Sequence, residues 1–588
     1  MQVAARRGGR RRVLLTATIA TLALALSGPT IALSAQANVR GDNYNSATAD
    51  TQVLGYNRMI RLSNSGASYN GQLISTTERS NTNGVESGFE IKRSTDDGAS
   101  WTTISTVPGE AYTYQPALFE FPQAVGAYPA GTLMLWGVTL PGDRSTTTMR
   151  QWRSADHGVT WSQEEIVQFA VGDDGEGLWE PEVELIGGKL VLYFSDERQR
   201  ATWSQYLGHI VSNDGGDSWS ANPDGSTNYA PGIVQDVASA SQKDRPGMMT
   251  VARNEATGTY IGTYEICGPK NCQVYFKTSS DGLTWGSGAS DLGTAIQTDD
   301  SRVLFSTPTA AWSPAGGVDG QFIVTAYREV RTTGGVGETG QVMFLNTDDG
   351  AGSWRWAPTP IYASPASWTQ TCLGNYSPFI LPSVNGASVR YTTEANFGAH
   401  GCTTVTGSFN TSVLPYAASF ANGDPGWVRY GGTWSTASNV LSESKGGYKA
   451  VTGSTAWKDY TLQGDVRIAT ASGNAGFLIR VTDPTEGTDT ARGYFIGVNG
   501  SALVIGRQNY NWTQLGSTPL AGGLATNTWY HLSVAIDGCD ITVQGRPAGS
   551  SAPTTNLSVS DCTFSHGAIG VRSFGTAAGW RYITVDER

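Results

Sequence analysis

Ser94-Thr-Asp96-Asp-Gly98-Ala-Ser-Trp101 decides the fold, because this eight-residue pattern returns along the chain. Two later copies keep its spacing and two more are altered by one residue, at 154–161, 212–219, 278–285 and 346–354. Ser and Asp side chains suit hydrogen bonds to the amides of a tight turn, Gly supplies a positive φ, and Trp covers the hairpin from one side. We therefore interpret the motif as a folding device that has no part in catalysis.

The spacing of the copies predicts a β-propeller. Their glycines are separated by 60, 58, 66 and 68 residues, a period that fits one four-stranded antiparallel sheet per repeat. Runs rich in β-branched and aromatic residues lie between the copies, and helical periodicity is nearly absent. The S-x-D-x-G-x-x-W spacing is that of the Asp-box and resembles sialidase-like propellers. We expect six blades, the last closed by pairing of N-terminal and C-terminal strands.

The N-terminus has the features of an export signal. Arg6, Arg7 and Arg10 to Arg12 precede an apolar run at 13–26, and Ala35-Gln-Ala37 supplies small residues for cleavage. The run is shorter than the roughly 20 residues that a membrane-spanning helix needs, which argues against the alternative of an anchor. Residues 1–37 are therefore predicted to be a secretion signal peptide, and the mature protein to be extracellular.

Export permits disulfides, and the six cysteines group by proximity into the pairs Cys267/Cys272, Cys372/Cys402 and Cys539/Cys562. This pairing is inferred from spacing alone. Metal ligation is the alternative, but the chain has five scattered His and no repeated C-x-x-C. A calcium site in either domain remains open, although no complete ligand loop can be read. We predict neither a cofactor nor a metal.

Charge and composition narrow the range of partners. The net charge of −11 includes the basic signal, so the mature protein is more acidic still, which disfavours nucleic acid and other polyanions as partners. A content of 18 Trp, 24 Tyr and 73 Gly suits a secreted β-protein that stacks rings on sugars, although aromatic residues also fill cores. The length allows a large domain and a smaller one. We expect a monomer.

The smaller domain is predicted at 416–588, after a propeller at 38–415. Short alternating strands at sandwich-like spacing occupy 427–434, 459–467, 475–480, 493–498 and 529–535. Their order resembles concanavalin-like (laminin-G-like) β-sandwiches, in which the Cys539/Cys562 pair would join neighbouring strands. One interpretation is a sugar-binding module with contacts at Tyr510, Trp512, Arg480 and Arg507. The other is a sandwich that only shields the propeller.

Two glutamates stand out as candidate catalytic groups, because hydrolysis of a glycosidic bond takes two carboxyls. Glu180 lies between Trp179 and Pro181, surroundings that favour a raised pKa. Glu265 ends an apolar strand beside Cys267. The two precede their repeat glycines by 36 and 17 residues, so they are not equivalent blade positions. Glu182 and Glu184 alternate with Glu180 and are expected to face solvent.

Several short motifs together resemble glycoside hydrolase family 93: those at 56–61, 178–181, 193–198, 244–248, 264–268, 306–308 and 375–378. The resemblance spans roughly residues 40 to 415. It implies a six-bladed, sialidase-like propeller that acts as a retaining exo-α-1,5-L-arabinanase and frees arabinobiose from the non-reducing end of linear arabinan, as in pectin side chains. The two catalytic Glu of the family map onto Glu180 and Glu265. A Tyr that tunes one carboxylate maps onto Tyr376.

The environments of the two glutamates suggest Glu180 as acid/base and Glu265 as nucleophile, with the reverse assignment left open. A retaining reaction needs the carboxyls about 5 to 5.5 Å apart. Candidate substrate-binding residues are Arg58, Trp179, Arg245, Tyr264 and Asn375.

Two other functions compete with the arabinanase. A sialidase needs three Arg, for which Arg58, Arg245 and Arg328 are candidates, and a Tyr376–Glu265 pair. Against it, the usual Arg-Ile-Pro signature is replaced by Arg58-Met-Ile, and a Trp-Glu-Pro motif is foreign to that mechanism. The second competitor is a catalytically silent propeller and sandwich that bind polysaccharide together.

Overall fold

The computed structural model describes residues 54–79, 87–162, 165–172, 176–221, 232–332, 337, 340, 342–363, 374–396, 402–410 and 412–588, and every structural statement below concerns these residues. The predicted signal peptide, Cys372 and the side chain of Cys402 lie outside this description. Within it, no helix is long and apolar enough to cross a membrane. The helices described are two 3-10 turns, η1 (Gly268–Lys270) and η3 (Ala437–Asn439).

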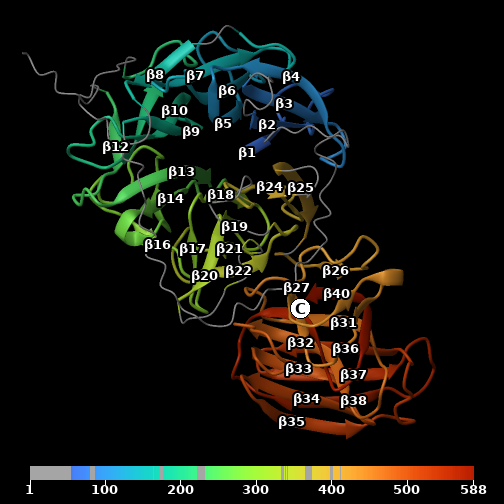
Figure 1. Cartoon of the computed structure of the whole chain (residues 1–588). Coiled ribbons are helices and arrows are strands. Elements are labelled where there is room, and N and C mark those ends of the chain that lie inside the picture. Colours follow the sequence, from blue (N-terminus) through green and yellow to red (C-terminus); the bar gives the residue numbers. More distant parts are fainter. Residues whose placement is uncertain are drawn as a thin grey trace, which may run out of the picture. The chain divides into compact units, whose positions relative to one another are not determined.

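Six antiparallel sheets follow one another up to residue 409, and Figure 1 shows them set around a common centre. The first sheet contains β1 (Leu54–Arg61), β2 (Leu73–Arg79), β3 (Gly88–Ser94) and β4 (Thr102–Pro108). The second contains β5 (Tyr112–Glu120), β6 (Leu133–Leu140), β7 (Thr147–Ser154) and β8 (Glu165–Ala170). The third contains β9 (Leu178–Ile186), β10 (Lys189–Asp196), β11 (Tyr206–Ser212) and β12 (Val234–Val237). Every residue of β6 is buried, because neighbouring blades cover both of its faces.

The other three sheets complete the ring. The fourth holds β13 (Arg245–Arg253), β14 (Tyr260–Cys267), β15 (Gln273–Ser279), β16 (Thr294–Ala295), β17 (Arg302–Phe305) and β20 (Arg328–Arg331); the fifth β18 (Thr309–Ser313), β19 (Gln321–Thr325), β21 (Val342–Asn346) and β22 (Arg355–Pro358); the sixth β23 (Phe379–Pro382), β24 (Val389–Asn396) and β25 (Cys402–Phe409). The first strands contact one another in the order β1, β5, β9, β13, β18, β23 and back to β1. They therefore surround the axis of a six-bladed propeller.

The repeated turns form the hydrogen bonds predicted from their sequence. In the first copy the Ser94 hydroxyl donates to Asp96 at 2.8 Å and accepts from the Gly98 amide at 2.7 Å, and Gly98 has φ of 86°. In the last copy Asn346 Oδ1 replaces the Ser hydroxyl and accepts from the Gly350 amide at 2.8 Å. The fourth copy keeps the Ser hydroxyl, since Ser279 accepts from the Gly282 amide at 2.8 Å, and the last copy keeps the turn by replacing that acceptor.

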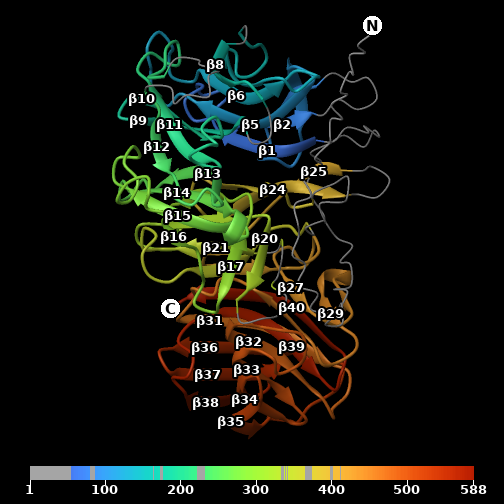
Figure 2. The ribbon, with the colours of Figure 1, turned by 60° about the vertical axis from the view of Figure 1, so that its left-hand side comes forward.

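Two further sheets, packed face to face, form the β-sandwich. One contains β26 (Tyr416–Ala418), β28 (Trp434–Ser435), β29 (Leu441–Glu443), β40 (Ala578–Glu587), β31 (Tyr460–Ile468), β36 (Tyr530–Asp537), β37 (Asp540–Pro547) and β38 (Thr555–Ser560); the other contains β27 (Val428–Tyr430), β30 (Lys449–Thr452), β39 (Ala568–Phe574), β32 (Asn474–Thr482), β33 (Arg492–Asn499), β34 (Ala502–Asn509) and β35 (Trp512–Pro519). Figure 2 shows the two layers, and fully buried side chains such as Phe477, Leu532 and Trp580 fill the space between them. The predicted fold class, a six-bladed propeller followed by a β-sandwich, is confirmed.

Two predictions on chain connectivity have different outcomes. The disulfides Cys267–Cys272 and Cys539–Cys562 are present as predicted, whereas the third pair falls outside the description. The predicted closing strand would lie before residue 54, which is also outside it. The described sixth sheet has three strands, and β1 belongs to the first blade. The boundary at 415/416 remains a prediction.

Buried contacts join the propeller to the sandwich. Trp356 on β22 donates its amide to the Thr455 hydroxyl at 2.8 Å, and the Thr455 amide donates back to the Trp356 carbonyl at 2.9 Å. Arg331 forms an ion pair with Asp483. One hydrophobic cluster draws side chains from both regions. The two regions are therefore held by a shared core in addition to the connecting chain.

Candidate active site

Each blade carries one strained backbone position where its first strand approaches the axis. Non-glycine residues adopt positive φ there, within or two residues before the first strand: Tyr56, Gln115, Glu180, Met248, Thr307 and Ser377. In four blades the inner pair of strands shifts register around these positions. Such bulges redirect side chains and are concentrated near active sites. The six positions therefore mark the candidate site.

Glu180 on β9 is held from three blades. Its Oε1 accepts a hydrogen bond from Gln115 Nε2 at 3.3 Å, and its own amide donates to Gln115 Oε1 at 3.0 Å. Its Oε2 accepts from the Ser195 hydroxyl and, at 3.2 Å, from the Met248 amide. Gln115 and Met248 occupy the strained positions of the neighbouring blades, so the ring of bulges clamps this carboxyl.

Glu265 on β14 lies beside this clamp. It is the register partner of Gly247, the residue before Met248, whose amide holds Glu180. The Thr307 amide anchors Glu265 Oε2 at 2.8 Å. Oε1 lies 3.2 Å from the Cys267 sulfur, which has no proton because it is disulfide-bonded. Glu265 is therefore fixed through one oxygen.

The two carboxyls are coupled electrically and hold protons more tightly than ordinary Glu. Burial raises the pKa of Glu180, although hydrogen bonds from Ser195 and Met248 and the charge of Arg245 oppose the shift. Burial raises the pKa of Glu265 to about 8; the Thr307 amide lowers it and the charge of Glu180 raises it further. Two interacting carboxyls titrate as a pair, and with the pKa of Glu265 raised to about 8 the pair retains a proton near neutral pH.

Tyr376 lies close enough to both carboxyls to feel their charges. Burial raises its pKa well above the usual value, and the charges of Glu265, Tyr56 and Glu180 raise it further. Its ring meets the Tyr327 ring edge-on, with centroids 6.1 Å apart. The phenol therefore stays protonated over the physiological range.

Glu197 is a functional residue that sequence reasoning missed. It is fully buried, accepts from Trp179 Nε1 at 2.8 Å and from the Gly177 amide at 3.0 Å, and forms an ion pair with Arg245. Arg245 in turn lowers the pKa of Glu180. The Trp179 side chain lies in the core, where its indole nitrogen donates to Glu197. Arg245 remains partly exposed beside the carboxyl pair.

The other three predicted binding residues make contacts within the protein. Arg58 donates to the Ser377 hydroxyl at 3.0 Å and stacks 4.1 Å from the Tyr56 ring centroid. Asn375 is fully buried and donates to the Tyr327 carbonyl at 2.7 Å. Tyr264 is fully buried and donates to the Leu292 carbonyl at 2.9 Å. The structure thus brings Arg58 to the axis, and sets Tyr264 and Asn375 in the core.

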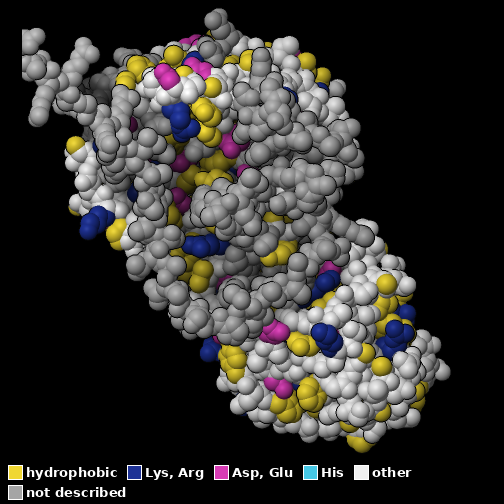
Figure 3. All heavy atoms as spheres, viewed as in Figure 1, with side chains coloured by type: hydrophobic (Ala, Val, Ile, Leu, Met, Phe, Trp, Pro, Cys, Tyr) yellow, Lys and Arg dark blue, Asp and Glu magenta, His cyan; other side chains and the backbone are white. Residues whose placement is uncertain are grey.

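The expectation that Glu182 and Glu184 face solvent is wrong. Both are half-buried on the side of β9 that carries Glu180. Burial raises the pKa of Glu182 to about 7, which Arg58 opposes, and that of Glu184 to about 8. Glu78 and Glu394, with pKa values raised by burial to about 7 and about 8, add to this acidic lining. Figure 3 shows acidic and hydrophobic side chains together in the hollow between the blades.

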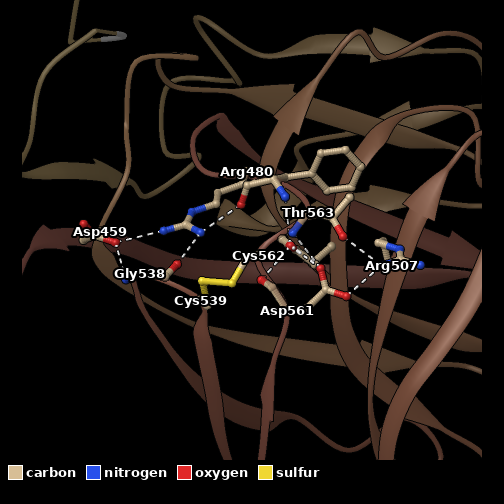
Figure 4. Close-up of a disulfide and its surroundings, with 10 residues drawn as sticks. Asp459, Arg480, Arg507, Gly538, Cys539, Asp561, Cys562 and Thr563 are labelled. Atoms are coloured by element: carbon tan, nitrogen blue, oxygen red, sulfur yellow. Dashed lines mark hydrogen bonds and ion pairs between the residues drawn. A yellow bond between two sulfur atoms is a disulfide. The ribbon is translucent and has the colours of Figure 1, made fainter.

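Three of the four sandwich residues suggested as sugar contacts form hydrogen bonds within the protein. Arg480 is buried and donates to the carbonyls of Gly538 and Phe564 and to Asp459, around the Cys539–Cys562 disulfide (Figure 4). In the same view Arg507 donates to Asp561 at 2.8 Å. The remaining two, Tyr510 and Trp512, are partly exposed, and the Tyr510 hydroxyl donates to Asp483. Of the four residues, Tyr510 and Trp512 keep exposed ring surface, and their contact with sugar stays a prediction.

Comparison with known proteins found similar solved structures but no matching family. No family model matches it, and no curated protein does. Among solved structures it is similar to an α-L-arabinofuranosidase of Fusarium graminearum in complex with an iminosugar inhibitor, at 25% identity over 63% of this chain and 95% of that chain, with a TM-score of 0.49. It is also similar to a GH93 α-L-arabinofuranosidase of the same fungus in complex with arabinobiose. The identity is 25% over 63% of this chain and 97% of that chain, with a TM-score of 0.49. A third similar structure is an α-L-arabinanase of Penicillium chrysogenum in complex with arabinobiose. The identity is 26% over 61% of this chain and 93% of that chain, with a TM-score of 0.48.

Proposed function

We propose that this protein is a secreted retaining glycosidase, an exo-α-1,5-L-arabinanase that releases arabinobiose from the non-reducing end of linear arabinan. The observation that supports a glycosidase most directly is the pair Glu180 and Glu265, two half-buried carboxyls on neighbouring blades that share a proton. The choice of arabinan and of the disaccharide product comes from the family 93 motifs along the propeller.

The reaction takes two displacements at one carbon. In the first, Glu265 attacks the anomeric carbon while protonated Glu180 gives its proton to the departing glycosidic oxygen, and the C–O bond breaks. In the second, Glu180 removes a proton from water, the water oxygen attacks the same carbon, and Glu265 leaves as a carboxylate. The configuration is retained because each displacement inverts it.

The shared proton must lie on Glu180 before the attack. In the substrate-free protein three donors stabilise the Glu180 carboxylate and the pKa of Glu265 is about 8, so the proton resides on Glu265. We assign to Tyr376 the role of stabilising Glu265 as a carboxylate, by donating its phenolic proton as a hydrogen bond. Movement of the proton to Glu180 when sugar displaces water then prepares both groups.

The sialidase alternative is weakened by the state of its arginines. Arg58 is buried on Ser377, Arg245 is paired with Glu197, and Arg328 is exposed with its guanidinium carbon 5.6 Å from the Phe305 ring centroid. Three arginines that clamp one substrate carboxylate need free, converging donors. The alternative of a catalytically silent protein that only binds polysaccharide does not explain why the site retains a proton or why three donors hold Glu180.

Debranched arabinan tests the proposal. Incubation followed by product sizing is expected to give arabinobiose from the start of the reaction, and Glu180→Ala and Glu265→Ala are each expected to lower the rate at least about 10²-fold. Glu176→Ala removes an exposed carboxyl four residues from Glu180 and serves as the matched control, with an unchanged rate. Cleavage of a sialoside without release from arabinan, or full activity in Glu265→Ala, would contradict the proposal.

A further inference from the structure

A row of alternating cationic and aromatic side chains crosses the outer face of the sandwich sheet that contains β31, β36 and β40. Asp465 on β31 is the register partner of His531 on β36 and of Arg581 on β40. Their neighbour Trp580 points into the core. Because side chains alternate along a strand, Arg581 lies on the opposite, outward face.

The cations and rings of this row are in contact. The guanidinium carbon of Arg467 lies 4.7 Å from the Trp529 ring centroid, and that of Arg581 lies 4.3 Å from the same centroid. Arg581 also lies 4.8 Å from the centroid of the Tyr582 ring. We call Arg467, Trp529, Arg581 and Tyr582 the arginine–aromatic row.

Tyr582 ends the row in a conformation that the sheet must hold against strain. Its φ is 56°, its side chain is 62% exposed, and the pairing of β31 with β40 shifts register around it. This conformation is unfavourable for a bulky residue, and an exposed ring gains nothing from burial to offset the strain. Strain of this kind is concentrated at binding sites.

The charges of the row are only partly neutralised. Asp465 uses one oxygen on His531 Nδ1 and the other on Arg581 Nε, each at 3.0 Å. Among the described residues, the terminal nitrogens of Arg581 and the guanidinium of Arg467 have no hydrogen-bond partner, and neither set is buried. Two guanidiniums with free planar donors thus face solvent on a chain whose net charge is −11.

We propose that the arginine–aromatic row binds uronate units of an acidic polysaccharide. Guanidinium groups recognise carboxylates through paired, charge-assisted hydrogen bonds, and two of them here have free donors. The exposed Tyr582 ring offers a flat apolar surface against which the C–H face of a sugar ring packs. Asp465 already pairs with Arg581, so a neutral sugar would leave the positive charge of Arg467 uncompensated. This site lies apart from the catalytic carboxyls and does not depend on the proposed arabinanase activity.

Affinity electrophoresis of the full chain in gels that contain polygalacturonate tests the proposal. Retardation is expected at low ionic strength, weaker retardation as salt is added because surface charges are screened, and none with the fully methyl-esterified polymer, whose carboxylates are blocked. Equal retardation by the esterified polymer, retardation by debranched arabinan alone, or no retardation by polygalacturonate would each overturn it.

Variants assign the effect to the row. Arg467→Gln and Arg581→Gln are each expected to weaken binding about tenfold, Arg581→Lys by less because the charge remains, and Tyr582→Ala by severalfold. Arg492→Gln, an exposed arginine on the other sheet, and Phe574→Ala, an exposed ring, are the matched controls and should bind as the parent does. Unfolding midpoints identify any variant that fails to fold. Binding that survives Arg467→Gln with Arg581→Gln in a folded protein would refute the site.

Discussion

The propeller and the sandwich use the same backbone device in surroundings of opposite charge. In the propeller, six residues with positive φ, four of them at bulges, converge on an axis lined by carboxyls, and one of the six is Glu180. In the sandwich, one strained bulge presents Tyr582 beside two arginines. Residues 416–588 carry twelve Lys and Arg against twelve Asp and Glu, so the net charge of −11 comes from residues 1–415. The comparison teaches that backbone strain fixes where a side chain points, while neighbouring charges decide what it can bind.

Ser195→Ala is expected to have the largest effect among the changes that spare both catalytic carboxyls. It removes a hydroxyl donor from Glu180 Oε2, so the pKa of Glu180 rises and kcat falls about tenfold. The basic limb of the pH–rate profile, which reports ionisation of the general acid, is expected to move to higher pH, a shift that a purely structural role for Ser195 would not produce.

Ser105→Ala is the control for this change. The Ser105 hydroxyl bonds the Gly158 carbonyl at 2.6 Å on the outer strand of the first blade, far along the chain from the carboxyl pair. Its loss should lower the unfolding midpoint slightly and leave the pH–rate profile in place. A Ser195→Ala enzyme with an unshifted profile would argue that the clamp around Glu180 has no catalytic role.

The pH dependence of stability is a smaller effect and separates the two regions. Burial raises the pKa of Glu184 and Glu265 to about 8, above the value near 4.3 of an unfolded Glu. Their contribution to stability is fully present below that unfolded value and is lost as pH rises towards 8. In the sandwich, hydrogen bonds from His531 and Arg581 hold the pKa of Asp465 below its usual value despite burial, so its contribution is lost only as pH falls through its folded pKa.

Thermal unfolding at pH 5 and pH 8 measures this difference. The midpoint is expected to be lower at pH 8 by at least about 4 °C. Glu184→Gln should shrink the gap, because it removes one carboxyl with a raised pKa, whereas Glu176→Gln, at an exposed site, should leave the gap as it is. A midpoint that rises from pH 5 to pH 8 would mean that the propeller carboxyls are ionised at no cost in the folded state.

The sequence predicted the fold well because the repeated turns are local. Ser94, Asp96 and Gly98 make their hydrogen bonds within five residues, so the eight-residue motif is enough to predict the hairpin. The regular spacing of the motif along the chain then predicts the ring of blades. The carboxyls Glu180 and Glu265 were also found from their immediate neighbours. These features share one property, which is that nearby residues in the chain determine them.

Features that depend on the register between blades escaped sequence reasoning. Gln115 donates a hydrogen bond to Glu180 from another blade, and no sequence pattern around Gln115 predicts that contact. Trp179 was expected at the sugar because it flanks Glu180, but alternation along β9 turns its ring into the core. The positive φ of Glu180 and Tyr582 left no signal, since neither is a residue type that favours that conformation.

Covalent trapping tests the central claim most directly, namely that Glu180 and Glu265 act as one catalytic pair. The Glu180→Ala enzyme would be incubated with an activated 2-fluoro arabinobioside and its peptides mapped by mass spectrometry. A glycosyl adduct on Glu265 is the predicted result. An adduct on Tyr376, as a sialidase mechanism would give, or on a residue outside the propeller axis would contradict the account.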